Sequence, residues 1–144
     1  MLRAYRREDC RLVPTELDLT PHSTPADAAG ALWLDLITPT REEVHFAEHL
    51  LGISIPTQEE AQEIEVSARL YHEDGAEFMT MTAMANLDTD QPVKSPVTFV
   101  LRENILVTVR YSDPKPFKLF PVPLLLGVAF LIMGWLRRGE DRDR

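Results

Sequence analysis

Cysteine and positive charge are both scarce in this chain of 144 residues. Cys10 is the only cysteine, which excludes a disulfide framework within the chain and a zinc site built from several cysteines. Fifteen basic residues face 23 acidic ones, for a formal net charge of −8, and this balance argues against a nucleic-acid partner. Nucleophile elbows, phosphate-binding loops and paired-carboxylate signatures are absent as well. These absences leave no feature that demands an enzyme.

The charges that are present divide the chain into two parts. Residues 1–117 hold ten basic and twenty acidic residues, whereas residues 118–144 hold five basic and three acidic ones. Residues 119–136 form a run of eighteen uncharged residues, about the shortest helix that spans a bilayer. Trp135 lies near the end of this run, and Arg137-Arg138 follow it directly. Tryptophan and arginine are typical of the interface between membrane and water. We predict an acidic domain over residues 1–117 and a membrane segment with a charged tail over residues 118–144.

Two alternatives remain for the apolar run, which are a helix docked on the domain and an unstructured tail. The orientation of a span also stays open, because four basic residues lie within about twenty residues on its amino-terminal side and four follow it. The first eleven residues are too charged for a signal peptide, so we expect the acidic domain to remain on the cytoplasmic side.

Hydrophobic patterning predicts an α/β fold, a mixed β-sheet with flanking helices. Capping boxes at Thr40 and Thr57 predict one helix that ends at Leu51 before Gly52, and a shorter one that ends near Glu65. A loop is expected over residues 20–30. The expected strands cover residues 2–13 (an edge strand), 31–37, 68–72, 76–86, 97–101 and 105–111.

One motif on the first predicted helix has the spacing of a zinc peptidase site. His45, Glu48 and His49 spell H-x-x-E-H, and two histidines four residues apart share a helix face. The alternative is an ordinary amphipathic helix, on which both histidines face solvent while Val44, Ala47, Leu50 and Leu51 face the core. We favour the amphipathic helix, because a catalytic zinc needs a cleft and a third ligand.

Two further clusters allow a metal or a plain structural interpretation. Glu59, Glu60, Glu63 and Glu65 could attract a hard cation, but a solvated helix face with a favourable dipole explains them as well. Met79, Met81 and Met84 could bind a soft metal through their thioethers. For these methionines we predict packing in the core, because methionine commonly fills irregular gaps.

Four stretches of the chain together resemble the CorA-type divalent cation channels and their ZntB-like relatives. Trp33 to Glu43 is similar to the strand-to-helix entry of that family, Leu50 to Glu65 to its second helical stretch, and Val97 to Arg110 to its last hairpin. Phe120 to Arg138 resembles the final membrane span and its basic tail. The similarity of the domain itself runs from about Leu32 to Phe117.

The resemblance implies parts that this chain lacks. These parts are a long stalk helix, a first span that lines the pore and a Gly-Met-Asn selectivity loop. The domain resemblance ends at Phe117 and the resemblance to the final span starts at Phe120, so the chain has no room for them between these residues. No Gly-Met-Asn tripeptide occurs in the sequence. The family also implies a cytosolic metal-sensing acid after the long central strand. Asp88 matches it, with Asp90 close by, and Mg²⁺ or another divalent cation is the implied ligand.

These observations give three expectations of function. The first is a CorA-like magnesium or divalent-cation transport protein of the inner or plasma membrane. It would be an internally shortened form with a cytoplasmic domain, unable to conduct alone, and the family implies a homo-pentamer. The second is a membrane-anchored regulatory or interaction domain without transport activity. The zinc peptidase is a third and weaker interpretation. The expected partners are the membrane and divalent cations, and no nucleic acid.

Overall fold

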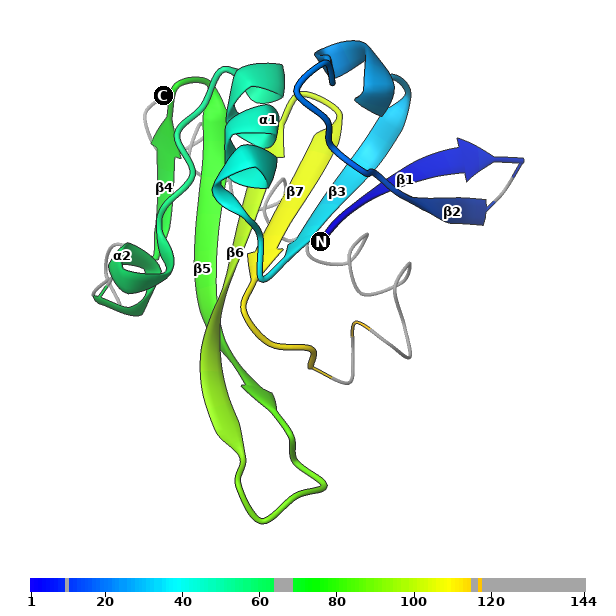
Figure 1. Cartoon of the computed structure of the whole chain (residues 1–144). Helices are drawn as coiled ribbons and strands as arrows, with labels where there is room; N and C mark the ends of the chain where they lie inside the picture. Colours follow the sequence, from blue (N-terminus) through cyan, green and yellow to red (C-terminus); the bar gives the residue numbers. More distant parts are fainter. Residues whose placement is uncertain (10, 64–68, 115–116, 118–144) are drawn as a thin grey trace.

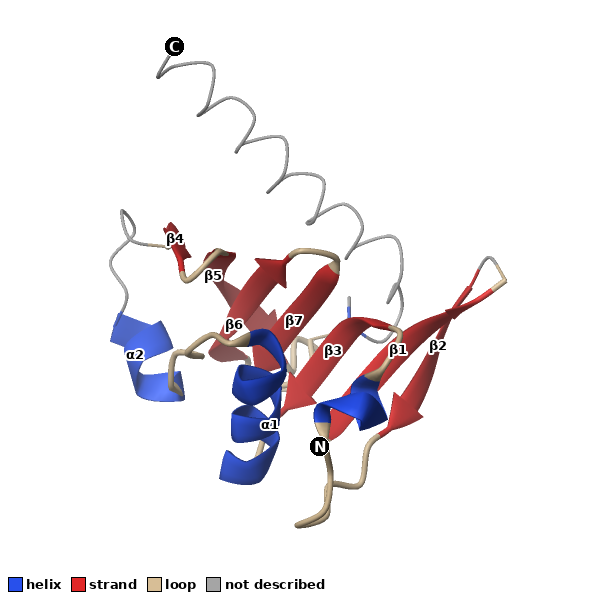
Figure 2. Cartoon of the chain, turned by 90° about the horizontal axis from the view of Figure 1, so that it is seen from above, coloured by secondary structure: helices blue, strands red, loops and turns tan. Residues whose placement is uncertain are grey.

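The structure is a computed structural model that describes residues 1–9, 11–63, 69–114 and 117. A seven-stranded mixed sheet in the order β2-β1-β3-β7-β6-β5-β4 forms its centre (Figure 1). Neighbouring strands run antiparallel except β3 and β7, which are parallel. Figure 2 shows the helical segments η1, α1 and α2 on the same side of this sheet. The expectation of a mixed sheet with flanking helices is thus confirmed.

Several element boundaries agree with the sequence-based prediction within one or two residues. The strand over residues 31–37 and the helix that ends at Leu51 are reproduced, and the hairpins fall where the turns predict them. The elements are β1 (Leu2–Glu8), β2 (Arg11–Glu16), η1 (Pro25–Ala28), β3 (Ala31–Ile37), α1 (Arg41–Leu51), α2 (Gln58–Glu63), β4 (Leu70–Glu73), β5 (Ala76–Ala85), β6 (Val93–Arg102) and β7 (Ile105–Arg110).

Three predictions about individual elements are wrong. Residues 2–13 form no single edge strand, because Asp9 adopts a positive φ of 53° and turns the chain into the hairpin of β1 and β2. Of these two strands only β2 lies at an edge of the sheet, with β1 between it and β3. The loop over residues 20–30 contains the short helix η1. Strand β6 begins at Val93 rather than Val97, and it tolerates Pro96 because β7 pairs with β6 only from Val97 onward.

Helix α1 begins and ends through the local interactions that its sequence predicts. The Thr40 hydroxyl accepts a hydrogen bond from the Glu43 amide at 3.3 Å, and the Glu43 carboxylate accepts one from the Thr40 amide at 2.8 Å. At the other end Gly52 adopts a left-handed φ of 61°, and its amide donates to the Glu48 carbonyl. These two caps set the length of the helix, and the inward side chain of Phe46 attaches it to the sheet.

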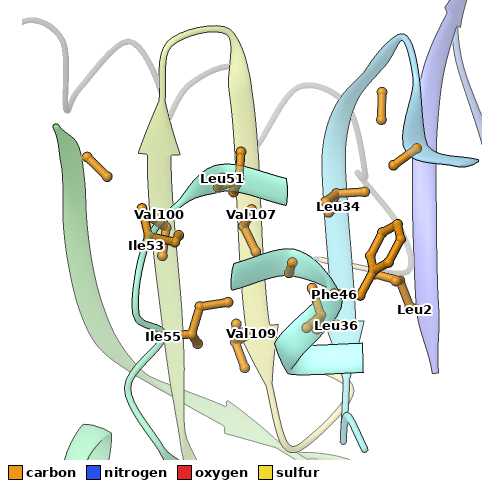
Figure 3. Packing of buried hydrophobic residues seen from close by; sticks show 14 of the residues in the cluster. Leu2, Leu34, Leu36, Phe46, Leu51, Ile53, Ile55, Val100, Val107 and Val109 are labelled. Atoms are coloured by element: carbon orange, nitrogen blue, oxygen red, sulfur yellow. The ribbon is translucent and has the colours of Figure 1, made fainter. Parts of the chain in front are cut away.

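The main core lies between α1 and the face of the sheet that it covers (Figure 3). Each leucine, isoleucine or valine side chain that is fully buried in this core contributes about 1.5–3 kcal/mol to the stability of the fold. The expected inward side of α1 is confirmed, since Ala47 and Leu51 are buried and Val44 and Leu50 pack against the core while partly buried. Phe46, which was not on the predicted inward side, is buried there as well. The labelled members in Figure 3 are Leu2, Leu34, Leu36, Phe46, Leu51, Ile53, Ile55, Val100, Val107 and Val109.

The opposite face of the sheet, here called the second face, carries a smaller apolar cluster. Tyr5 stacks on Trp33 with ring centroids 3.8 Å apart, and Phe99 lies beside the Phe117 ring at 6.4 Å. Val97 and Leu106 complete the buried part of this cluster. The second face is therefore buried at its centre as well, although the described helices all lie on the other side of the sheet.

The far end of the β5–β6 hairpin, here called the ribbon, extends beyond the other strands (Figure 1). Its exposed apolar residues are Met81, Met84, Leu87 and Val93, at 43–59% exposure. The prediction of core packing is wrong for Met81 and Met84 and holds only for Met79, which packs on the second-face cluster. The physical reason is that no further strand or helix covers this part of the hairpin in the described residues.

Candidate functional site

The two acids named as candidate metal ligands lie at the tip of the ribbon. Asn86 adopts a positive φ of 58° at the end of β5 and starts the turn. Its carbonyl accepts hydrogen bonds from the Thr89 amide at 3.0 Å and the Thr89 hydroxyl at 2.9 Å. Asp88 and Asp90 flank Thr89 in this turn, and both are exposed. Carboxylates two residues apart in a compact exposed turn are suited to a hard divalent cation that retains most of its water.

Within the described part of the chain, the ribbon tip does not bring a third acid to these two. Among the residues that the structure describes, no group of three His, Cys, Asp or Glu side chains has the geometry to hold a metal ion. A cation at Asp88 and Asp90 would therefore bind weakly, with water as its other ligands. The role of the two acids stays a prediction.

The H-x-x-E-H motif lies on the solvent side of α1, as the amphipathic interpretation predicts. His45 and His49 are exposed. The His45 Nδ1 lies 3.2 Å from a carboxylate oxygen of Glu48, and the other oxygen accepts a hydrogen bond from the Ile55 amide at 2.8 Å. Through this hydrogen bond Glu48 stabilises the position of the chain that follows α1. Glu48 therefore has a structural role, whereas in a zinc peptidase the glutamate of this motif would act as the general base.

The acidic run on α2 also has a structural explanation. Thr57 and Glu60 form a capping box, in which the Glu60 carboxylate accepts hydrogen bonds from the Thr57 amide at 2.8 Å and the Thr57 hydroxyl at 2.9 Å. These bonds, from the Thr57 backbone first and its side chain second, lower the pKa of Glu60. Glu59 and Glu63 are exposed, and Glu65 lies outside the described residues.

A buried polar network on the second face was missed from the sequence. Asp35 of β3 and Arg110 of β7 form a bidentate ion pair, with Nε–Oδ1 at 3.1 Å and Nη2–Oδ2 at 2.9 Å. Their side chains are only 1% and 3% exposed. The Thr108 hydroxyl donates to Asp35 at 2.7 Å, and it accepts a hydrogen bond from the Trp33 indole at 2.9 Å. The network thus joins the two parallel strands at the centre of the sheet.

The electrostatics of this network keep Arg110 charged. Burial alone lowers the pKa of Arg110, but the hydrogen bonds and charge of Asp35, followed by those of Asp113, outweigh it and raise the pKa above its ordinary value. Burial, and secondly the charge of Asp35, raises the pKa of Tyr5. Arg110 therefore remains a cation inside the protein.

The sequence contains a feature that indicates a buried ion pair, namely an isolated charge in each of two apolar strands. Asp35 is the single charge in the apolar run of residues 31–37, and Arg110 is the single charge in residues 105–111. A lone charge within a buried strand requires a partner. Because Asp35 and Arg110 are 75 residues apart in the chain, only the parallel pairing of β3 with β7 reveals that these two charges are partners.

Comparison with known proteins places the chain in a family of transporters. The family model "CorA-like Mg2+ transporter protein" matches residues 28–121. The chain is 36% identical over 103 residues to the magnesium transport protein CorA of Wolinella succinogenes, an alignment that covers 68% of this chain and 30% of the relative. It is 33% identical over 121 residues to the CorA protein of Pectobacterium atrosepticum, which covers 83% of this chain and 36% of the relative. The chain belongs to the CorA-like family.

Solved structures support the same fold. The complete CorA magnesium transporter of Methanocaldococcus jannaschii superposes with a TM-score of 0.52 at 17% identity, over 82% of this chain and 34% of that one. The soluble domain of the same protein gives a TM-score of 0.51 at 14% identity, over 82% and 43%. The fold is therefore that of the CorA soluble domain. The expectation that the chain is not an enzyme is confirmed by its family, whose members are transporters.

The match covers only part of each relative. The chain spans about a third of the length of these curated relatives. Among the described residues, no helix has the length and apolar character needed to cross a bilayer. The predicted membrane segment at residues 119–136 lies outside the described residues and stays a prediction.

Proposed function

We propose that residues 1–117 are the cytoplasmic domain, and residues 118–144 the membrane segment and tail, of an internally shortened CorA-like protein for magnesium or a related divalent cation. The single observation that carries this proposal is the family match over residues 28–121, which extends into the uncharged run of residues 119–136. The resemblance implies a stalk, a first span and a Gly-Met-Asn loop between these parts, and the sequence has no room for them. The protein binds cations without conducting them by itself.

A second candidate function is a membrane-anchored regulatory or interaction domain without any transport role. The exposed apolar side chains of the ribbon favour it, since exposed clusters of large apolar residues mark surfaces that contact other proteins. The two proposals share the membrane segment and differ in whether the ribbon tip binds a cation.

Flotation on lipid vesicles tests the membrane segment that both proposals require. The full chain should float with vesicles, whereas a fragment of residues 1–117 should stay in the dense fraction and give a folded circular dichroism spectrum, because its sheet and helices form their own core. A full chain that stays with the fragment would contradict both proposals. An unfolded fragment would show that the apolar run belongs to the core of the domain.

Paramagnetic Mn²⁺ is the probe that separates the two proposals. In the fragment of residues 1–117, Mn²⁺ should broaden the amide signals of residues 86–91, because Asp88 and Asp90 supply the carboxylates. The double substitution Asp88→Asn and Asp90→Asn should remove this broadening. The matched control, Glu59→Gln with Glu63→Gln on α2, should leave it unchanged. Broadening centred on α2 instead, or none at the ribbon tip, would favour the interaction domain.

A further inference from the structure

Arg110 holds the chain where it leaves the sheet, in addition to pairing with Asp35. Its Nη1 donates to the Ser112 carbonyl at 3.1 Å and to a carboxylate oxygen of Asp113 at 2.6 Å. With the two bonds to Asp35, four of the five N–H groups of a guanidinium are engaged. One buried side chain thus bonds the neighbouring strand β3 and, at the same time, the residues that follow β7.

Phe117 completes this arrangement from the other side. The Arg110 guanidinium lies 4.6 Å from the centroid of the Phe117 ring, a cation–π contact. The same ring lies 6.4 Å from Phe99 of β6, and the Phe117 amide donates to the Pro114 carbonyl at 3.0 Å. Phe117 is therefore held over β6 and β7 on the second face, instead of continuing away from the end of β7.

We propose that Asp35, Arg110, Asp113 and Phe117 form an exit joint, which fixes where the chain leaves the domain relative to the sheet. In this joint Arg110 is the positioning residue, and Asp35 sets its orientation from the central strand. A stability role alone would need only the Asp35 pair, whereas the bonds to Ser112, Asp113 and Phe117 all act on the segment after β7.

A geometric requirement makes arginine specific for this position. The planar guanidinium bonds Asp35 along one edge, uses its other nitrogen for Ser112 and Asp113, and presents its face to Phe117. Lysine carries the same charge but has no fork and no planar face. The substitution Arg110→Lys therefore keeps the charge at the site and removes the joint.

Distances between two spin labels in the full chain, purified in detergent micelles, test this proposal. The labels are attached at Leu32→Cys, an exposed position of β3, and at Lys118→Cys, directly after Phe117, in a Cys10→Ser background. The parent should give one narrow distance distribution. In Arg110→Lys the released segment of six residues spreads over roughly 13 Å as a flexible linker, so the distribution should broaden about two-fold. Phe117→Ala releases only the residues after Asp113, so its distribution should broaden by a smaller amount.

The controls separate the joint from a purely structural role. Phe117→Ala leaves the Asp35–Arg110 pair intact, so its unfolding temperature should stay within a few degrees of the parent while the distribution broadens. Leu87→Ala, which removes an exposed apolar side chain at the ribbon tip, should change neither. A broad distribution in the parent, or a narrow one in Phe117→Ala, overturns the proposal. The inference goes beyond the proposed function and needs neither cation nor bilayer, so flotation and Mn²⁺ results leave it unaffected.

Discussion

Vesicles that contain only this protein should show no magnesium uptake above that of empty vesicles. A pore needs helices that line it and polar groups that replace the hydration shell of the ion. Residues 119–136 contain no charged and no amide side chain, and the chain has no Gly-Met-Asn tripeptide. Copies could associate through Gly127 and Gly134, but the seam between them would be apolar and closed. The measurement is the signal of a magnesium-sensitive dye inside the vesicles.

The positive control for this measurement is the CorA protein of Pectobacterium atrosepticum, a relative of this chain, reconstituted at the same protein-to-lipid ratio. Flotation of both preparations verifies that each protein is in the bilayer. Saturable uptake by the present chain would contradict the proposal that it is a shortened form unable to conduct alone. The expected difference is complete, with uptake in the control and none in vesicles of the present chain.

The largest loss of stability is expected from Asp35→Ala. The substitution leaves the Arg110 cation buried at 3% exposure, with the partly exposed Asp113 as its remaining carboxylate. Thr108 loses the acceptor of its hydrogen bond. Removing one member of a buried ion pair costs about 3–5 kcal/mol, because the other charge stays in a medium that solvates it poorly. Urea unfolding followed by circular dichroism measures the change.

Two further variants make this prediction specific. Asp18→Ala removes an exposed acid, and its free energy of unfolding should stay within about 0.5 kcal/mol of the parent. Replacing both partners, with Asp35→Leu and Arg110→Met, should restore most of the stability, because no unpaired charge is then left in the core. If Asp35→Ala is as mild as Asp18→Ala, the pair is not buried in solution.

Local sequence signals predicted those parts of the fold that local interactions determine. Thr40, Glu43 and Gly52 define the ends of α1 because each acts on backbone groups within four residues. The turn with Gly75 at a φ of 74° joins β4 to β5 where its glycine predicts it. The errors lie where the environment decides, as at Asp9, which divides the first predicted strand, and at Met81 and Met84, which extend past the sheet.

The residues of the candidate site were likewise predictable from the sequence only where local patterns determine their environment. Asp88 and Asp90 were identified through resemblance, and the structure locates them in an exposed turn, but their role as ligands remains to be tested. The exposure of His45 and His49 followed from helical periodicity alone. The Asp35–Arg110 pair could not be derived in this way, because its members belong to different strands, each of which is locally an apolar segment with one misplaced charge.

The sequence by itself determined the family, the mixed sheet with its capped helices, and the contrast between acidic residues 1–117 and the uncharged run at residues 119–136. These properties depend on composition, periodicity and contacts between near neighbours. Only the tertiary structure decided that β1 lies inside the sheet, that the ribbon extends beyond it, and that Arg110 joins β3 to the residues after β7. Each of these depends on which distant strands pair, and the pairing is chosen by the burial of a whole sheet face and the need to neutralise a buried charge, two requirements that no short segment contains.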